Sequence, residues 1–361
     1  MEFLFEIPVL GFVFQFFGYL ITAIATTNLP SQTLQLATPI ALGAMCGVLN
    51  ERSGIVNIGI EGMMLTAAFV GFMAAMLVHE SMPSTPSAFF GFTPAIIVGI
   101  LAAIGAGMLV SLLHAWLSIS VRADQIISGT VINITALGLT GYLNRLIAPG
   151  GSAGTLAPFR PPPELLDLPL VGWIFRMFLS VGPISMSVIV IVIVMQVLLF
   201  RSRWGLRTRA VGEHPRAADT VGIDVIRLRY RNVILGGIFA GLAGAWLTLE
   251  FNASFQNGMT ANRGFIALAA VIFGRWTPLG AFGGALLFMF SEALGIAIRS
   301  NPPPGDLGIA LSGLQSSFPS LYNNFFGALP YVLTIIVLAG VVGRSVAPAA
   351  VGRPYVKEGA S

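Results

Sequence analysis

Charged side chains are scarce in this 361-residue chain, at 9% of the sequence, whereas hydrophobic residues make up 55%. Soluble globular proteins contain about 25% charged residues, so a chain of this composition would expose too much apolar surface in water. A soluble protein is therefore excluded, and the net charge of +4 does not indicate a nucleic-acid partner. The composition predicts an integral membrane protein, surrounded by membrane lipid.

Three residue types that often carry chemistry are nearly missing. Lys357 is the only lysine, so the chain has no lysine for a Walker-type phosphate loop. Cys46 is the only cysteine and can form no internal disulfide. The three histidines, His79, His114 and His214, do not have metal-ligand spacing. We therefore expect no metal, no cofactor and no nucleotide-binding module, and any ATP must be hydrolysed by another subunit.

Long apolar runs are what the sequence has in abundance. Several are long enough to cross the ~30 Å hydrocarbon layer as helices, and the short alternating segments of a β-barrel do not occur. We expect an all-α, polytopic transmembrane bundle of about ten spans, forming a single transmembrane domain over residues 1–361. The predicted spans are 9–27, 33–49, 58–78, 94–118, 124–147, 181–200, 232–250, 264–274, 279–297 and 328–343. Met1–Glu6 lacks a basic region, so we expect no cleaved signal peptide.

One predicted span is too short to cross the layer. The run 264–274 is followed by a glycine, Gly274, and soon after by a proline, Pro278. Such interruptions are tolerated at membrane depth only where protein or a water-filled cavity satisfies the freed backbone groups. We therefore expect a short or broken helix near 264–280.

The basic residues predict the orientation, because arginine and lysine accumulate on the cytoplasmic side. Placing the arginine-rich loop 201–231 inside makes both termini, and the tail 344–361, cytoplasmic. The inner side then holds Arg201, Arg203, Arg207, Arg209, Arg216, Arg227, Arg229 and Arg231 of that loop, with Arg52, Arg122, Arg275, Arg344, Arg353 and Lys357. The outer side holds only Arg145, Arg160, Arg176, Arg263 and Arg299. The outer loops 79–93, 148–180 and 298–327 are rich in Pro, Ser and Gly, which do not continue a helix.

Polar residues interrupt two apolar runs between Leu49 and Met63. Glu51 and Arg52 suit a turn at the lipid headgroups. Asn57 and Glu61 fall four apart and would share a face of the following helix, just inside the bilayer. A carboxylate there is costly unless it faces protein or water. Interior hydrogen bonding and the lining of a transport path both remain open for these two residues.

The arginine-rich loop contains a candidate for a short amphipathic helix over 213–224. Pro215 suits a first helical turn and Gly222 suits a C-terminal stop. A solvated loop without regular structure is the alternative. A compact basic element of this kind is a natural docking surface for a cytosolic partner.

Three segments resemble the permease subunits of bacterial ABC importers in the branched-chain amino acid and simple-sugar superfamily, and the nucleoside-type members most closely. They are Asn50–Met64, Ala123–Gly129 and Gly264–Arg275, and the resemblance runs from about residue 33 to 343. It implies that the 213–224 helix is a coupling helix inserted into a cleft of the ATPase subunit, with Glu213, Pro215, Ala217, Ala218, Gly222 and Ile223 at the contact. His214 and Arg216 replace the more familiar asparagine and acidic residue.

The same resemblance implies the partners. These are an ATP-binding subunit, a second and related permease subunit, and a periplasmic or lipid-anchored solute-binding protein docking on the outer loops 148–180 and 298–327. The chain would be a transport subunit of the bacterial inner membrane, not an enzyme. Its small-molecule substrates would be nucleosides or related sugar-containing solutes, which need aromatic stacking and amide hydrogen bonds more than fixed charge.

Few polar residues are available for the substrate pathway. Gln125 and Asn133 lie eight apart, on one face of span 124–147, and interhelical hydrogen bonding is the alternative for both. Glu250 and Glu292 are intramembrane carboxylates, which either act in transport or pair with a neighbouring helix. His114 is expected to be a packing or headgroup residue.

Two other classes of protein compete with a permease subunit. An ion-coupled secondary carrier of small polar solutes needs an embedded ion site and usually inverted repeats, and no inverted match is evident here. An intramembrane hydrolase needs a nucleophile with its base, or metal ligands, and the histidines do not supply these.

Overall fold

The computed structural model describes residues 8–26, 29–82, 90–147, 180–340 and 345–356, together with isolated positions between them. Most of the predicted outer loop 148–180 and part of loop 79–93 lie outside the described residues, as does the end of the tail. The predicted sides of the membrane for Arg160, Arg176, Arg344 and Lys357 concern residues that lie outside the described part of the chain.

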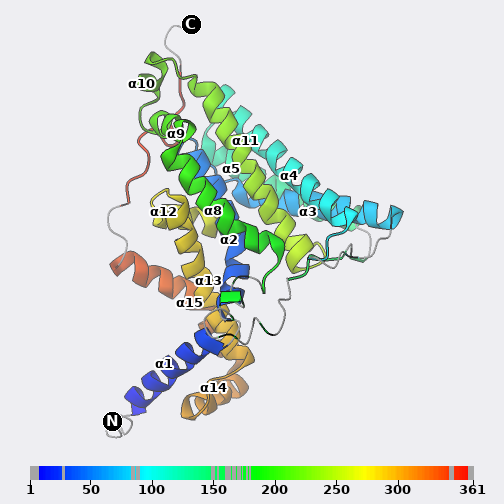
Figure 1. The fold of residues 1–361 in the computed structure, drawn as a ribbon, viewed down its shortest axis with the longest axis vertical. Helices are drawn as coiled ribbons and strands as arrows, with labels where there is room; N and C mark the ends of the chain where they lie inside the picture. Colours follow the sequence, from blue (N-terminus) through cyan, green and yellow to red (C-terminus); the bar gives the residue numbers. More distant parts are fainter. Residues whose placement is uncertain are drawn as a thin grey trace. The chain divides into compact units, whose positions relative to one another are not determined.

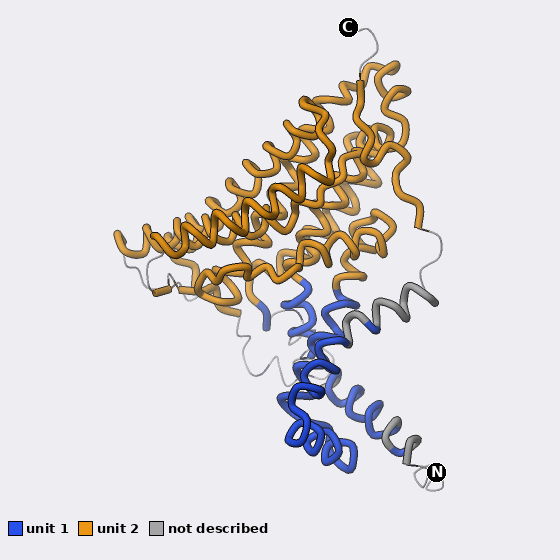
Figure 2. The backbone as a smooth tube through the Cα atoms, turned by 180° about the vertical axis from the view of Figure 1, so that it is seen from behind, with its two compact units in different colours: residues 1–37, 160–181, 286–343 blue, residues 38–159, 182–285, 344–361 orange. Residues whose placement is uncertain are grey.

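The chain divides into two compact units, which Figure 2 distinguishes by colour. The first comprises residues 1–37, 160–181 and 286–343, and the second comprises 38–159, 182–285 and 344–361. Each unit is described by itself below. The prediction of a single domain over 1–361 stays a prediction.

The larger unit is a bundle of helices, and no strand occurs among its described residues. Its helices α3, α4 and α11 lie side by side, and α9 and α10 follow α8 toward the end of the unit where the C-terminal tail also lies (Figure 1). The elements wholly in this unit are α3 (Ile60–Ser81), α4 (Pro94–Ala115), α5 (Gln125–Ile147), α8 (Pro183–Arg201), α9 (Arg203–Glu213), α10 (Pro215–Thr220), α11 (Val225–Ala245) and α12 (Arg263–Phe273). Helices α4 and α11 continue as the π-helical turns η2 (Trp116–Ser120) and η3 (Trp246–Phe251), and α2 (Leu29–Glu51) and α13 (Pro278–Ser300) contribute to both units.

The smaller unit contains α1 (Pro8–Thr26), α14 (Asp306–Ser317) and α15 (Pro319–Gly340). The Leu307 N–H donates to Gln15 Oε1 at 3.0 Å, which fixes the start of α14 against α1. The predicted loop 298–327 is therefore wrong in part, because it contains α14 and the first turns of α15. The prolines at 302–304 end α13, as expected, but they also leave Asp306 free to begin a new helix after Gly305 at φ +82°.

The described residues contain seven helices long and apolar enough to span a membrane, and the expected count of about ten stays a prediction. Helix α12 has eleven residues and rises only about 16 Å, half of the hydrocarbon layer. The 9–27 run forms the 19-residue α1, of which Phe14–Ile24 is a shorter apolar stretch, and the 328–343 run extends beyond the described residues. The seven are Leu29–Glu51, Ile60–Ser81, Pro94–Ser120, Gln125–Ile147, Pro183–Arg201, Val225–Phe251 and Pro278–Ser300.

Glycines allow α4 and α11 to touch backbone to backbone. A Cβ atom added at Gly241 would lie 2.6 Å from the Ile104 Cα and 2.7 Å from the Ala103 carbonyl oxygen. One added at Gly237 would lie 2.6 Å from the Gly107 carbonyl oxygen. Close approach of this kind is how helices associate in lipid, where no hydrophobic driving force brings them together.

We predict that Gly241→Leu separates α4 from α11 and lowers the melting temperature of the folded protein. Backbone atoms cannot move aside as a flexible side chain does, so the cost should reach or exceed the ~3 kcal/mol upper range for overpacking. The control is Gly105→Leu in α4, where an added Cβ meets nothing within 4 Å. Thermal unfolding in detergent measures both variants, and equal melting temperatures would contradict the prediction.

Candidate functional site

An irregular segment, residues 52–59, joins α2 to α3 and is the centre of the candidate site. Ser53, Gly54, Ile55 and Asn57 of this segment are buried, and buried backbone groups need hydrogen-bond partners from the protein. The Val56 N–H donates to Gln125 Oε1 at 2.7 Å, and the Val56 carbonyl accepts from His114 Nε2 at 2.9 Å. Side chains of α5 and α4 thus replace the hydrogen bonds that a helix would have supplied.

Asn133 of α5 also forms hydrogen bonds to backbone groups, slightly further along the chain than Val56. Its Nδ2 donates to the Ile58 carbonyl at 3.0 Å, and its Oδ1 accepts from the Gly62 N–H at 2.7 Å. Gln125 and Asn133 do lie on one face of α5, as their spacing predicts, and that face lies against residues 56–62. Both side chains therefore form hydrogen bonds that hold the bundle together, which is one of the two roles expected for them. A role in the substrate pathway stays a prediction for both.

Three residues at the start of α5 stabilise this part of the structure. Asp124 Oδ1 accepts from the Ile126 and Ile127 N–H groups at 2.8 and 3.0 Å, which caps the helix. Ser128 Oγ lies 3.1 Å from His114 Nδ1 and helps to orient that ring. A Cβ added at Gly129 would lie 2.7 Å from the Gly59 nitrogen, so only glycine permits this approach.

The prediction that Asn57 and Glu61 share a helical face is wrong, because α3 begins at Ile60. Asn57 lies before the helix, in the irregular segment, and is fully buried. Its Nδ2 lies 3.8 Å from the Cys46 sulfur and 3.5 Å from the Met63 sulfur. The spacing argument failed because side chains of α4 and α5 satisfy this backbone without a helix.

Glu61 holds the N-terminal end of the short helix α12. Its Oε1 accepts from the Asn262 N–H at 2.9 Å and its Oε2 from the Gly264 N–H at 2.6 Å. A carboxylate is well placed there, because the first N–H groups of a helix have no partner within it. Ala261 and Asn262 adopt the left-handed region, at φ +47° and +65°, and the carboxylate hydrogen bonds help to offset the strain.

Glu51 and Arg52 hold the other end of α12. The Trp276 indole N–H donates to Glu51 Oε2, and Arg52 Nε donates to the Trp276 carbonyl at 2.8 Å. Arg52 Nη2 also donates to the Arg275 carbonyl at 3.2 Å. Burial lowers the pKa of the Arg52 guanidinium from its usual value. The break after α12 agrees with the predicted short helix. Glu51 and Arg52 form hydrogen bonds to the residues at this break, whereas the sequence suggested a turn at the lipid headgroups.

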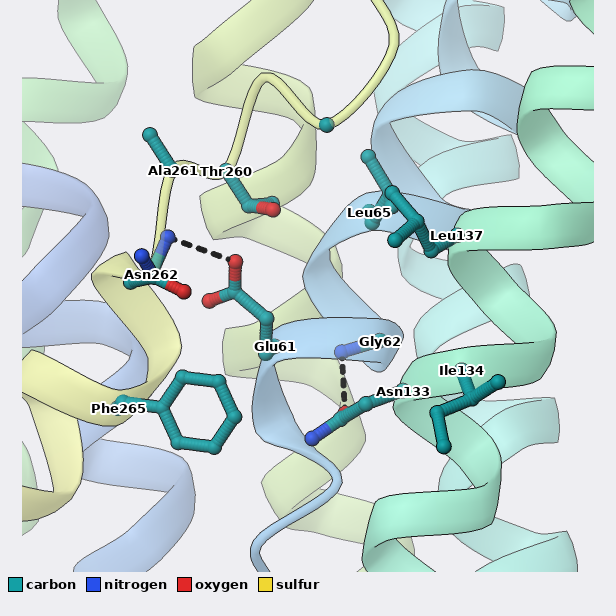
Figure 3. Close-up of a pocket in the computed structure, with 11 residues that line it drawn as sticks. Glu61, Gly62, Leu65, Asn133, Ile134, Leu137, Thr260, Ala261, Asn262 and Phe265 are labelled. Atoms are coloured by element: carbon teal, nitrogen blue, oxygen red, sulfur yellow. Dashed lines mark hydrogen bonds between the residues drawn. The ribbon is translucent and has the colours of Figure 1, made fainter.

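A cavity of about 290 Å³ opens between α3, α5 and the segment leading into α12. Figure 3 shows the Glu61 carboxylate turned toward Asn262 and the Asn133 amide turned toward Gly62. Phe265, on α12, is 43% exposed and lines the cavity. Of the predicted pathway residues, Glu61 and Asn133 line it. The full lining is Glu61, Gly62, Leu65, Asn133, Ile134, Leu137, Gly258, Thr260, Ala261, Asn262 and Phe265.

Glu250 and Glu292 are not among the residues that line this cavity. Glu250 is buried at the N-terminal end of α8, where its carboxylate accepts from the Ile184 N–H at 2.7 Å and the Ser185 N–H at 3.1 Å. The Ser185 hydroxyl donates to it as well, at 2.5 Å. Glu250 therefore pairs with a neighbouring helix, α8, which is one of the two roles expected for it. Glu292 is half-buried on α13 in the smaller unit, and its role stays a prediction.

The predicted coupling loop 201–231 is largely helical, since α9, α10 and the start of α11 occupy it. The predicted 213–224 helix is the six-residue α10, which begins at Pro215 and ends at Thr220. Gly222 follows at φ +84°, in the left-handed conformation expected of a helix stop. The predicted span 232–250 begins earlier, at Val225, so Arg227, Arg229 and Arg231 belong to α11.

One face of α10 packs and the other is open. Ala218 is buried in a cluster with Val211, Val225 and Leu228, and Ile223 packs against it. His214, Arg216 and Ala217 are exposed, while Glu213 and Pro215 are half-buried. The structure thus brings the predicted coupling residues together as one element supported by α9 and α11.

The tail residues 345–356 pack against this region, which the sequence did not indicate. The Ala350 N–H donates to the Gly212 carbonyl at 2.9 Å, and the Ala349 N–H donates to Glu213 Oε2 at 3.1 Å. The Gly352 N–H donates to the Gly54 carbonyl at 3.1 Å. The tail and α10 border a second cavity, of about 570 Å³.

Arg229 joins the tail to the irregular segment. It is 2% exposed, and its Nε donates to the Ser53 carbonyl at 3.0 Å while its Nη1 donates to the Arg353 carbonyl at 3.2 Å. The orientation count treated Arg229 as one charge among eight. No local pattern in the sequence marked Arg229 as buried.

The seven helices that are long and apolar enough to span a membrane indicate a multi-pass membrane protein. Residues 29–338 match the family described as the branched-chain amino acid transport system / permease component, and the chain belongs to that family. It is a permease subunit of an ABC importer, not an enzyme, and ATP hydrolysis is left to a partner.

The similar proteins are permeases of the same kind. The chain is 39% identical to the guanosine ABC transporter permease protein NupQ of Bacillus subtilis, over 90% of this chain and 95% of the relative. It is 37% identical to the nucleoside ABC transporter permease protein NupC of Lactococcus lactis, over 89% and 94%. It is 34% identical to the putative glucose ABC transporter permease protein TsgC13 of Haloferax volcanii, over 88% and 92%. No solved structure matches the chain.

We predict that Glu61→Ala destabilises the protein by about 2–4 kcal/mol, because two backbone N–H groups of the α12 start lose their acceptors. Glu61→Gln keeps one acceptor oxygen and should cost about half as much. Both effects are read as shifts of the melting temperature of the purified protein. A Glu61→Ala variant that melts like the unmodified protein would show that these hydrogen bonds do not hold α12.

Proposed function

We propose that this chain is the membrane-spanning permease subunit of an ATP-driven importer of nucleosides or related sugar-containing solutes, coupled to a separate ATPase through α10. In this proposal ATP binding closes two ATPase domains, their motion is passed to α10, and the membrane helices alternate between outward and inward openings. The permease pairs with a second, related permease, and a periplasmic or lipid-anchored protein delivers the solute.

The observation that carries the proposal is the construction of α10. A six-residue helix bounded by Pro215 and Gly222 presents exposed side chains, while Ala218 anchors it in a packed cluster. A short helix held in this way moves as one body with α9 and α11. Its surroundings are basic, which favours a cytoplasmic location, and the tail packed against it is then cytoplasmic too.

The solute class is supported by the relatives and by the chemistry of the cavity. Two of the similar permeases are named for guanosine and nucleosides. The cavity combines the exposed ring of Phe265 with the polar side chains of Thr260 and Asn262. Its one carboxylate, on Glu61, already accepts two backbone N–H groups. Such a lining suits a neutral, partly aromatic solute.

No observation favours an ion-coupled carrier. The carboxylates of Glu61 and Glu250 both accept hydrogen bonds from backbone N–H groups at helix N-termini. Both carboxylates are therefore already engaged within the protein. Among the described residues, no group of three or more His, Cys, Asp and Glu side chains could hold a metal ion.

Coupling is tested at Gly222. We predict that Gly222→Val lowers the initial rate of nucleoside uptake at least about tenfold, because a β-branched residue at this φ costs of order 1–3 kcal/mol and distorts the end of α10. Gly222→Asn is the matched control, since asparagine tolerates the left-handed region and an added Cβ meets nothing within 4 Å. Unchanged uptake by Gly222→Val, at equal amounts in the membrane, would remove the coupling role of α10.

The solute cavity is tested at Phe265. We predict that Phe265→Ala raises the KM for nucleoside uptake about tenfold, as expected for loss of one aromatic stacking partner worth roughly 1–3 kcal/mol. Phe265→Tyr should retain uptake. Ile272→Ala is the control in the same helix, because Ile272 is 48% exposed but does not line the cavity. An equal effect of the Phe265→Ala and Ile272→Ala variants on KM would contradict the assignment.

A further inference from the structure

A groove of about 630 Å³ runs between α8 and α11, away from the solute cavity. Its walls are apolar: Val190, Val194 and Leu198 come from α8, and Leu235 and Phe239 come from α11. Val190 and Val194 are 62% and 47% exposed, so the groove is open along α8. Both helices are among the predicted membrane spans, so this opening faces either lipid or another membrane protein.

One end of the groove has a different chemistry. Ser202, Arg203, Trp204 and Arg231 line it there, and both arginines are exposed. No acidic residue lines the groove. The Trp204 indole donates to Asn232 Oδ1 at 3.1 Å, which fixes the ring, and the Arg231 guanidinium lies 5.9 Å from the ring centroid. Tryptophan and arginine together are typical of the level of the lipid headgroups.

The start of α9 adds to the positive character of this end. Ser202 is the N-cap residue of α9, and its hydroxyl accepts from the Gly205 N–H at 3.0 Å. Arg203 is therefore the first residue of a helix of eleven residues. The N-terminal end of a helix attracts anions, phosphate above all, through its unpaired N–H groups. Two guanidinium groups and a helix N-terminus thus border the same apolar groove.

We propose that this groove binds an anionic phospholipid of the cytoplasmic leaflet, with an acyl chain between α8 and α11 and the phosphate at Arg203 and Arg231. The proposal rests on the orientation given under the proposed function, which places this end on the cytoplasmic side. Basic pockets between transmembrane helices on that side are suited to acidic headgroups. The groove supplies what such an amphiphile needs, an apolar slot that ends in two cations.

A second permease subunit fits the groove less well. It would have to remove water from both guanidinium groups, and removing a charge from water is costly unless a well-placed partner compensates. A phospholipid supplies that partner with its own phosphate and leaves the guanidinium groups at the hydrated interface. The charge of the groove end therefore favours lipid.

The test uses the complete transporter, purified in mild detergent and analysed by native mass spectrometry with added phospholipid. The probes are phosphatidylglycerol and phosphatidylcholine with identical acyl chains. We expect the transporter to retain phosphatidylglycerol selectively. Arg203→Gln and Arg231→Gln should each weaken retention about fivefold, and the double variant about 25-fold, as expected for the loss of one or two cations near a headgroup.

The matched control is Arg207→Gln/Arg227→Gln, which removes the same charge from the same region without altering the groove. It should retain phosphatidylglycerol normally. Equal retention of the two lipids, or unchanged retention by the Arg203→Gln/Arg231→Gln variant, would overturn the proposal. So would competition by millimolar inorganic phosphate without any dependence on the acyl chains, because the site would then bind free phosphate.

A second variant, Val194→Trp, fills the apolar part of the groove. We expect it to lose phosphatidylglycerol while the two permeases stay together. Dissociation of the permease pair in this variant would instead show that a second permease occupies the groove. Because lipid retention is measured without transport, a wrong solute or a failed uptake assay does not affect the outcome. Conversely, normal nucleoside uptake with no lipid selectivity would leave the proposed function intact.

Discussion

The larger unit depends on one constraint: the backbone between α2 and α3 is not helical, although it lies among transmembrane helices. Much of this backbone is buried, so its polar groups need partners within the protein. Gln125, Asn133 and His114 supply three side-chain partners, and Arg229 supplies a fourth at Ser53. Backbone groups of residues 48–51 and of the tail supply others. Helices α4, α5 and α11 are therefore held in register by hydrogen bonds to a single segment. Leaving any one of these buried groups without its partner costs about 1–3 kcal/mol.

The short helix α12 follows from the same segment. Its eleven residues cannot span the layer, so both of its ends lie inside the protein and need partners. Glu61 provides them at the start of α12, while Glu51 and Arg52 provide them at its end. Residues on either side of the irregular segment thus hold the two ends of one helix. The carboxylates of Glu51 and Glu61 both accept hydrogen bonds in this arrangement, and Glu61 also lines the cavity.

The sequence predicted where helices begin and end better than it predicted contacts between helices. Pro215 and Gly222 predicted α10 because their backbone preferences are local, and Gly274 with Pro278 predicted the break after α12 for the same reason. The helical spacing of Asn57 and Glu61 misled, because the partners that keep residue 57 out of a helix come from other helices. The burial of Arg229 and the packing of the tail could not be predicted, since neither is encoded by a local pattern.

Contacts within the larger unit connect α10 to the solute cavity without a gap. Ala218 of α10 packs with Val225 and Leu228 of α11, and the next residue, Arg229, is bonded to the Ser53 carbonyl. From Ser53 the irregular segment leads to Gly62, whose N–H is held by Asn133 at the cavity. Under the proposed function, a displacement of α10 reaches the cavity through packed or hydrogen-bonded groups at every step. The Ala218 cluster and the Arg229–Ser53 hydrogen bond are buried, and the Gly62–Asn133 hydrogen bond is half-buried. Packed contacts have discrete arrangements rather than continuous ones, so a small displacement at α10 favours one arrangement of the cavity over another. The tail strengthens the same path, because its backbone is bonded to Gly212 beside α10 and to Gly54 in the irregular segment.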